Sequence, residues 1–384
     1  MRIFIGTYLL FSLTLSDTIA AQDAKLGLAE HEKIAAELSL GKAFKQYQSL
    51  LELDERSNAM PYAHRVYMVA KSKLDENPKR KKTFAAAAVN YGRLLVYANH
   101  KDRASKILGE ALSAQEELYG ENALELMDTL MDLGHAKTKF LKQASGKKYY
   151  DRAIAIAKAN SSENSAVVAQ LYFEMSEQML VNGSGSRKQA IRNLTKAQSI
   201  FKSSLGASNA RTALASYRLG EVKKLQGKHS EAVPLLESAA KVFDEQSPLE
   251  KYTIKAHSML ISAYEHLGKG EKATKHCQAV GKIKAARKEK FPSGFSLMPL
   301  HIIKPHYPSN ANRRGIEGFA TIELTVSKEG KTKDFRTLRW HGSKEFSKAA
   351  IKAAQKFRYA VQFKDGEPIE TQGVKYKFTF NLTN

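Results

Sequence analysis

The feature that most constrains the fold is a helical periodicity that runs from about residue 23 to residue 290. Apolar residues recur there at spacings of three and four, which is typical of amphipathic helices, and no strand-like alternation interrupts them. A longer repeat is superimposed, because Gly227, Ala232, Leu236 and Ala239 recur 41 positions later as Gly268, Ala273, Cys277 and Val280. A pair of helices cannot bury its apolar face alone, so we expect neighbouring pairs to stack.

Small residues have a physical role in this predicted packing. Ala190, Ala232 and Ala273 let the second helix of each pair lie close against the first, while Gly227 and Gly268 end the first helix and turn the chain. The period and these residues resemble tetratricopeptide repeats (TPR) with an extended loop between units. That resemblance implies a curved solenoid whose concave surface binds a peptide or protein. The alternative is a spacer that only holds the last domain away from its point of attachment.

A different pattern begins after the helical region. Four of the nine prolines fall within residues 292–308, which indicates a domain boundary. Residues 319–326 alternate in polarity and predict a half-buried strand, and residues 332–340 complete a hairpin. Apolar residues from Phe346 to Phe357 predict a helix, and residues 374–382 show the clearest strand alternation in the chain. The predicted fold class is therefore mainly α, a TPR-like helical solenoid, plus a small α+β domain of order β-β-α-β.

The order of these elements resembles the C-terminal domain of TonB. The residues that agree are, in chain order, Tyr307-Pro308, Ile316-Glu317-Gly318, a glycine-containing hairpin and Phe357-Arg358-Tyr359. The resemblance implies that the last strand lies at a sheet edge and receives a short segment of an outer-membrane transporter as an added strand. It places the partner-binding residues in that strand and in the Tyr-Pro segment: Tyr307, Pro308, Asn310, Asn312, Val374, Tyr376, Phe378 and Phe380.

Three observations qualify what this resemblance implies. One face of the last strand must be buried in any case, so Tyr376, Phe378 and Phe380 are also candidates for the core, and partner contacts are expected to be chiefly through backbone groups. Asn310 and Asn312 stand where the family usually has arginine and glutamine. The family's energy transducers also have an inner-membrane helix and a proline-rich arm, whereas this sequence is predicted to have a signal peptide and a solenoid instead.

The N-terminal segment is predicted to direct export. Arg2 precedes an apolar run of 14 residues, Ile3 to Ser16, and Ala20 and Ala21 supply a cleavage site. The alternative is a retained inner-membrane anchor, although a spanning helix needs about 20 apolar residues. The predicted domains are a signal peptide at residues 1–21, a TPR-like repeat domain at 22–290, a linker at 291–304 and a TonB C-terminal-like domain at 305–384.

The charge balance is strongly basic, with 61 Lys and Arg residues against 39 Asp and Glu residues and a net charge of +22. Such an excess favours polyanionic partners, which for an exported protein are anionic cell wall or membrane surface rather than nucleic acid. The single cysteine, Cys277, allows no internal disulfide and is expected to be buried. No catalytic, cofactor-binding or metal-binding motif stands out, and neither a cofactor nor a small-molecule substrate is expected.

Two functions are compatible with these observations. The first is a non-enzymatic protein of the Gram-negative periplasm that binds an outer-membrane TonB-dependent transporter by strand addition, while its solenoid recruits another envelope protein. The alternative is a basic structural scaffold associated with the cell envelope or peptidoglycan and without a role in transport.

Overall fold

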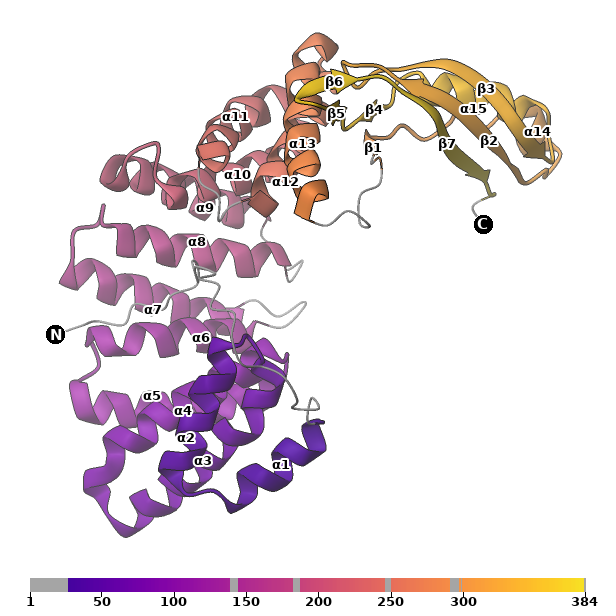
Figure 1. Ribbon diagram of the computed structural model, residues 1–384. Helices are drawn as coiled ribbons and strands as arrows, with labels where there is room; N and C mark the ends of the chain where they lie inside the picture. The colour runs from indigo at the N-terminus through magenta and orange to yellow at the C-terminus, as the bar shows by residue number, and fades with distance from the viewer. Residues whose placement is uncertain are drawn as a thin grey trace. The chain divides into compact units, whose positions relative to one another are not determined.

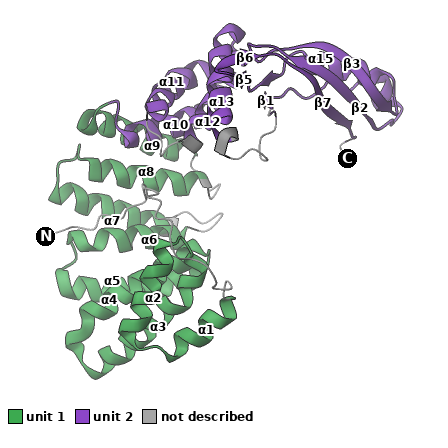
Figure 2. Ribbon diagram, viewed as in Figure 1, with its two compact units in different colours: residues 1–206 green, residues 207–384 purple. Residues whose placement is uncertain are grey.

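The computed structural model describes residues 27–138, 144–181, 187–245, 250–290, 297 and 299–382. The signal peptide predicted at residues 1–21 and much of the linker predicted at 291–304 lie outside these residues. Two compact units make up the chain, residues 1–206 and residues 207–384, which Figure 2 shows in green and purple. Within the described ranges, no helix combines the length and the apolar character that crossing a membrane requires.

The first unit is a series of helical hairpins (Figure 1). Its elements are α1 (Leu28–Glu37), α2 (Leu40–Glu52), α3 (Arg56–Glu76), η1 (Pro78–Arg80), α4 (Lys81–Tyr97), α5 (Lys101–Tyr119), η2 (Leu124–Leu126), α6 (Met127–Lys137), α7 (Ala144–Asn160), α8 (Ala166–Val181) and α9 (Arg187–Leu205). The most extensive packing is between α2 and α3, α4 and α5, α6 and α7, and α8 and α9. This pairing of successive helices is TPR-like and confirms the predicted fold class.

Close approach within a pair depends on a glycine in its first helix. Three glycines each pack against a side chain of the second helix that lies 16 positions later in the sequence: Gly92 against Leu108, Gly134 against Tyr150, and Gly220 against Leu236. A Cβ atom on any of these glycines would lie 2.6–2.8 Å from the partner side chain, which is closer than Cβ atoms are found in proteins. The alanines that the repeat predicts in the second helices of pairs, Ala190, Ala232 and Ala273, are fully buried.

The first helices of four pairs end in the same way. Gly227 and Gly268 have φ values of 74° and 67°, so the predicted glycine turns are confirmed. Asp54 and Asn99 occupy the same position after α2 and α4, with φ values of 57° and 62°. In all four places the next residue donates its amide to the carbonyl five positions earlier, which is the Schellman arrangement of a helix C-terminus.

The second unit combines two helical hairpins with a small sheet domain. Its elements are α10 (Ala210–Leu225), α11 (His229–Glu245), α12 (Glu250–His266), α13 (Gly270–Lys290), β1 (Pro299–His301), α14 (Ser309–Arg313), β2 (Gly318–Val326), β3 (Thr332–His341), α15 (Glu345–Ala354), β4 (Arg358–Tyr359), β5 (Gln362–Lys364), β6 (Glu367–Ile369) and β7 (Thr371–Phe380). The predicted order β-β-α-β is confirmed as β2, β3, α15 and β7. The helix that was expected to reach Phe357 ends at Ala354, and β4 follows it.

The core of the sheet domain lies between α15 and one face of the sheet. Alternate residues of β2 are buried, as the sequence predicts: Ala320, Ile322, Leu324 and Val326. Facing them from α15 are one large residue, Phe346, and small residues such as Ala350 and Ala353, which let the helix approach the strands closely. Burial of this set is what fixes the strand register, because a shift by one residue would turn it toward solvent.

A polar cluster lies on the first helices of three successive pairs in the first unit. Arg93 of α4 donates to Asp132 of α6 at 2.8 Å and to Asp128 of α6 at 3.3 Å. Glu174 of α8 accepts a hydrogen bond from Gln170 at 2.8 Å. The pKa of Glu174 is raised to about 7, chiefly by burial and also by the negative charges of Asp128 and Asp132, while the hydrogen bond from Gln170 and the charge of Arg93 act in the opposite direction.

We expect Glu174→Gln to stabilise the protein at pH 8 but not at pH 4. The pKa of Glu174 is raised in the folded state, so the protonated side chain is the form that folding favours. The stability that Glu174 contributes is therefore fully present below its unfolded pKa of about 4.3 and is lost as the pH rises through about 7. Screening by solvent at this half-buried site limits the expected gain at pH 8 to about 1–2 kcal/mol. The check is the difference in free energy of unfolding between variant and wild type at the two pH values. A difference that does not change with pH would contradict the raised pKa.

Candidate partner-binding site

Between Val374 and Phe380, β7 presents the most regular unpaired strand edge of the three-stranded sheet. The strand order is β3-β2-β7, so among the described residues neither β3 nor β7 has a second neighbour. Pairing of β7 with β2 is uninterrupted over seven residues, from Gly318 opposite Phe380 to Leu324 opposite Val374. Pairing of β3 with β2 is broken by two register shifts, and Asp334 in β3 has a positive φ of 53°. Bulges and twists hinder strand addition, so β7 is the better template.

The side chains of β7 divide between the two faces of the sheet. Phe378 and Phe380 are buried in the core, where Phe380 stacks on Phe346 with ring centres 4.2 Å apart. Val374 and Tyr376 are half-buried and pack against the same core. On the opposite face Lys375, Lys377 and Thr379 are exposed. The aromatic residues predicted at the site therefore pack in the core. A partner at this edge would contact the backbone of β7 and the side chains of β7 on either face of the sheet.

The Tyr-Pro segment lies beside the end of β7. The Tyr307 ring packs edge-on against Phe380 and Phe346, each with ring centres 5.7 Å apart. Its hydroxyl donates to the carbonyl of Ile316 at 2.7 Å, which fixes the segment to the start of β2. Pro308 precedes the short helix α14, on which Asn310 and Asn312 are exposed. The structure thus places Tyr307 against β7 as support, with Pro308 at the start of α14, and it leaves the two asparagines accessible.

An arginine of β4 links the sheet domain to the last helical hairpin. Arg358 is 6% exposed and donates to Glu265 of α12 at 2.6 Å and to the carbonyl of Gly270 at 3.0 Å. Its remaining nitrogen, Nη1, is buried without a hydrogen-bond partner. A buried cation is costly unless it is paired, so this ion pair fixes where β4 lies on α12.

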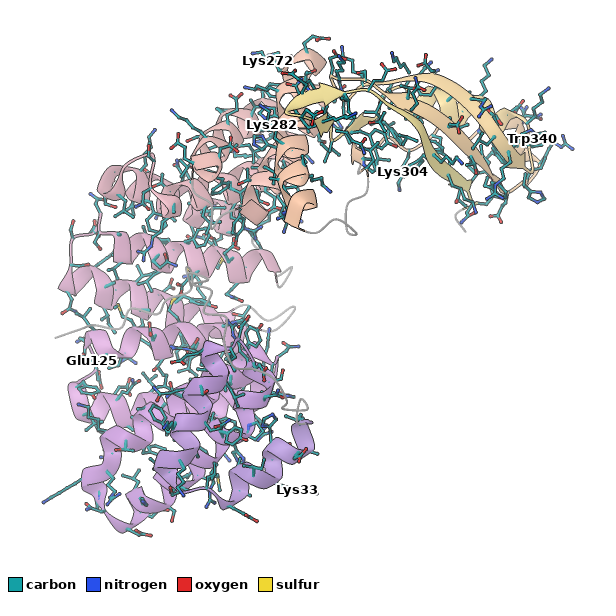
Figure 3. All side chains as sticks on the ribbon, viewed as in Figure 1. Lys33, Glu125, Lys272, Lys282, Lys304 and Trp340 are labelled. Atoms are coloured by element: carbon teal, nitrogen blue, oxygen red, sulfur yellow. The ribbon has the colours of Figure 1, made fainter. Side chains whose placement is uncertain are left out.

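Backbone contacts complete this junction, by which we mean the contacts of α12 and α13 with residues 328–331 and 358–363. Val361 donates its amide to the carbonyl of Cys277 at 3.3 Å. A Cβ atom on Gly281 of α13 would overlap the carbonyl oxygen of Val361, so only glycine allows this approach. Lys282, labelled in Figure 3, places its ammonium 5.8 Å from the ring centre of Phe363. As expected, Cys277 is buried, and burial raises the pKa of its thiol to about 12.

The sequence did not reveal the junction. Pro299–His301, within the segment predicted as a linker, forms β1 and pairs with β4. One sequence signal could have pointed to Arg358: it is the only charged residue in the run Phe357 to Val361, whose other members are apolar. A cation in such a run is expected to be buried and therefore paired. Nothing in the run identifies Glu265 as its partner.

The histidines of the last domain differ in their surroundings. His301 is buried with its ring centre 5.7 Å from that of His266, whereas His306 and His341 are exposed. Across the part of the chain that the structure describes, no group of three or more His, Cys, Asp or Glu side chains is arranged to hold a metal ion.

Comparison with known proteins agrees with the two parts of the fold. Residues 303–382 match the protein family described as Gram-negative bacterial TonB protein C-terminal. Protein TonB of Pseudomonas aeruginosa is 29% identical over 82 residues, which cover 21% of this chain and 24% of that protein. The match therefore spans about a quarter of this relative.

Among solved structures, helical-repeat proteins are similar to this chain. BtubC (BKLC) from P. vanneervenii has 17% sequence identity and a TM-score of 0.49, over 65% of this chain and 94% of that chain. A putative kinesin light chain from Podosopora anserina with nearly identical TPR-like repeats has 16% identity and a TM-score of 0.42, over 54% of this chain and 97% of that chain. The described helices of this chain pair in a TPR-like way, and residues 303–382 are similar to the TonB C-terminal family, as the sequence predicts.

Proposed function

We propose that this protein is an exported periplasmic adaptor that captures an extended segment of an outer-membrane transporter at the β7 edge. The observation that carries the proposal is the uninterrupted, unpaired edge of β7 over Val374 to Phe380. Such an edge can form main-chain hydrogen bonds with an added strand, while the side chains of β7 next to that strand determine which sequences bind. The match of residues 303–382 to the TonB C-terminal family supports a role in protein interaction in the cell envelope. In this proposal, Asn310, Asn312 and the helical repeats contact further parts of the partner or a second envelope protein.

The test is site-specific photocrosslinking in living cells, with the probe in place of Thr379, an exposed residue of β7. We expect capture of an outer-membrane protein through a segment near its N-terminus. The matched control is the same probe in place of Leu338, which is 39% exposed on the irregular β3 edge and should capture nothing. Equal capture at both positions, or capture of cell-wall material alone, would contradict strand addition at β7.

The net charge of +22 favours a second candidate, a structural scaffold that binds the anionic cell wall or a membrane surface. Attraction between exposed charges falls steeply with ionic strength, because the screening length shortens from about 10 Å at 0.1 M salt to about 3 Å at 1 M. Strand pairing through backbone hydrogen bonds depends less on ionic strength. If the protein sediments with purified peptidoglycan at low salt and is fully released at 0.5 M salt, while position 379 captures no protein, the scaffold is the better description.

A further inference from the structure

The face of the sheet opposite α15, which we call the open face, carries rows of side chains set by the strand register. In an antiparallel sheet, residues paired across strands project from the same face. Three rows follow, each ordered β3, β2, β7: His341, Phe319 and Thr379, then Arg339, Thr321 and Lys377, then Arg336, Glu323 and Lys375. Successive rows lie about 7 Å apart and neighbouring strands about 5 Å apart.

The open face has an excess of positive charge that the described residues do not compensate. Its carboxylate, Glu323, pairs with Arg336 at 2.5 Å. Nearby Lys333 pairs with Glu370 at 2.6 Å. Within the described ranges, Arg339, Lys375 and Lys377 have no carboxylate partner. Two of these three cations, Lys375 and Lys377, lie on β7 at alternate positions along the free edge.

The cations of the middle row lie over an aromatic ring instead of a carboxylate. The Lys377 ammonium is 4.5 Å from the ring centre of Phe319, and the Arg339 guanidinium is 5.7 Å from it. Between these two cations the Thr321 hydroxyl is covered and has no hydrogen-bond partner. Cation–π contacts at exposed sites are worth only about 0.5–1 kcal/mol, so the charges remain available to an anion.

A strand added to β7 would have different neighbouring side chains on the two faces of the sheet. On the open face its side chains would stand next to Lys375 and Lys377, with Cβ atoms about 5 Å away. On the other face they would continue the apolar surface of Val374, Tyr376 and Phe378. We propose that the β7 edge selects an extended segment in which two acidic residues, two positions apart, alternate with apolar residues. This inference rests on the proposed strand addition and adds the chemistry of the partner.

The test uses the full chain and three synthetic nine-residue peptides, with binding measured by fluorescence polarisation at 50 mM salt. The first peptide alternates valine with glutamate, and the second alternates valine with glutamine. The third is the glutamate peptide with its central residue replaced by proline, which removes a backbone donor and prevents regular pairing. Two cross-strand charge pairs are expected to make the glutamate peptide bind about 10-fold more tightly than the glutamine peptide.

Matched variants assign the effect to the edge. In Lys375→Gln/Lys377→Gln the preference for glutamate should disappear. In Lys348→Gln/Lys352→Gln, which makes the same charge change at two exposed residues of α15, the preference should remain. A preference lost equally in both variants reflects net charge and overturns the inference.

The peptides also separate this inference from the proposed function. Equal affinity for the glutamate and glutamine peptides, with weaker binding of the proline peptide, overturns the acidic preference and leaves strand addition standing. Equal affinity for the glutamate and proline peptides overturns strand addition itself. Absence of binding by the glutamate peptide overturns the acidic preference, and crosslinking at position 379 then decides strand addition separately.

Discussion

Arg358→Met is expected to lower the free energy of unfolding of the second unit by about 3–5 kcal/mol, the usual cost of removing one partner from a buried ion pair. The variant loses the bonds to Glu265 and to the carbonyl of Gly270, and it leaves the Glu265 carboxylate, 21% exposed, without its cation. Trp340 on β3, labelled in Figure 3, is the only tryptophan in the chain and reports on the sheet domain. Its fluorescence during denaturant unfolding gives the measurement.

Two comparisons show whether the junction is responsible. Arg336 is paired with Glu323 but is 71% exposed, so Arg336→Met should cost less than about 1 kcal/mol. Arg358→Met/Glu265→Met should recover much of the loss, because no buried charge remains unpaired. If Arg358→Met costs no more than Arg336→Met, the ion pair does not hold the sheet domain on α12.

Gly281→Ala is expected to destabilise the second unit by about 1–3 kcal/mol, although glycine to alanine normally stabilises a helix. The new methyl group would overlap the carbonyl oxygen of Val361, and it would lie 3.0 Å from the ring of Phe363. The Val361 carbonyl belongs to the backbone and cannot move aside by a side-chain rotation, so α13 must shift away. Hydrogen exchange at the Val361 amide, which donates to Cys277, should become faster.

The control is the same substitution where space is free. A Cβ on Gly109, an exposed residue of α5, would meet no atom within 4 Å. We expect Gly109→Ala to stabilise the protein by about 0.5–1 kcal/mol. If both alanine variants are stabilising and leave exchange at Val361 unchanged, the close approach of α13 to Val361 is wrong.

Periodic features of the fold could be predicted from the sequence. Alternation in β2 identified the buried residues Ala320 to Val326, and the 41-residue repeat located the turns at Gly227 and Gly268. The equivalent turns at Asp54 and Asn99 do not follow from that repeat, because the repeat is marked at its turns by glycine. Asparagine and aspartate also tolerate a positive φ, and their short polar side chains hide the repeat from a comparison of residue types.

Contacts between distant segments could not be predicted in the same way. Arg358 and Glu265 are 93 positions apart, and no period relates them. The β7 edge was predicted, but the roles of its residues depend on the register: the same pairing that buries Phe378 leaves Lys375 and Lys377 on the open face. The proposed preference for acidic segments thus depends on the residues of β7 that the core does not bury.

The junction has a consequence for how two ligands would influence each other. Because α12 and α13 are held to the sheet domain by buried contacts, a ligand bound on this last hairpin is presented to β7 at a nearly fixed distance. The effective concentration of one binding surface at the other is then set by geometry and not by the length of a tether. Two weak interactions with one partner reinforce each other when their spacing matches that distance, and are mutually exclusive when it does not.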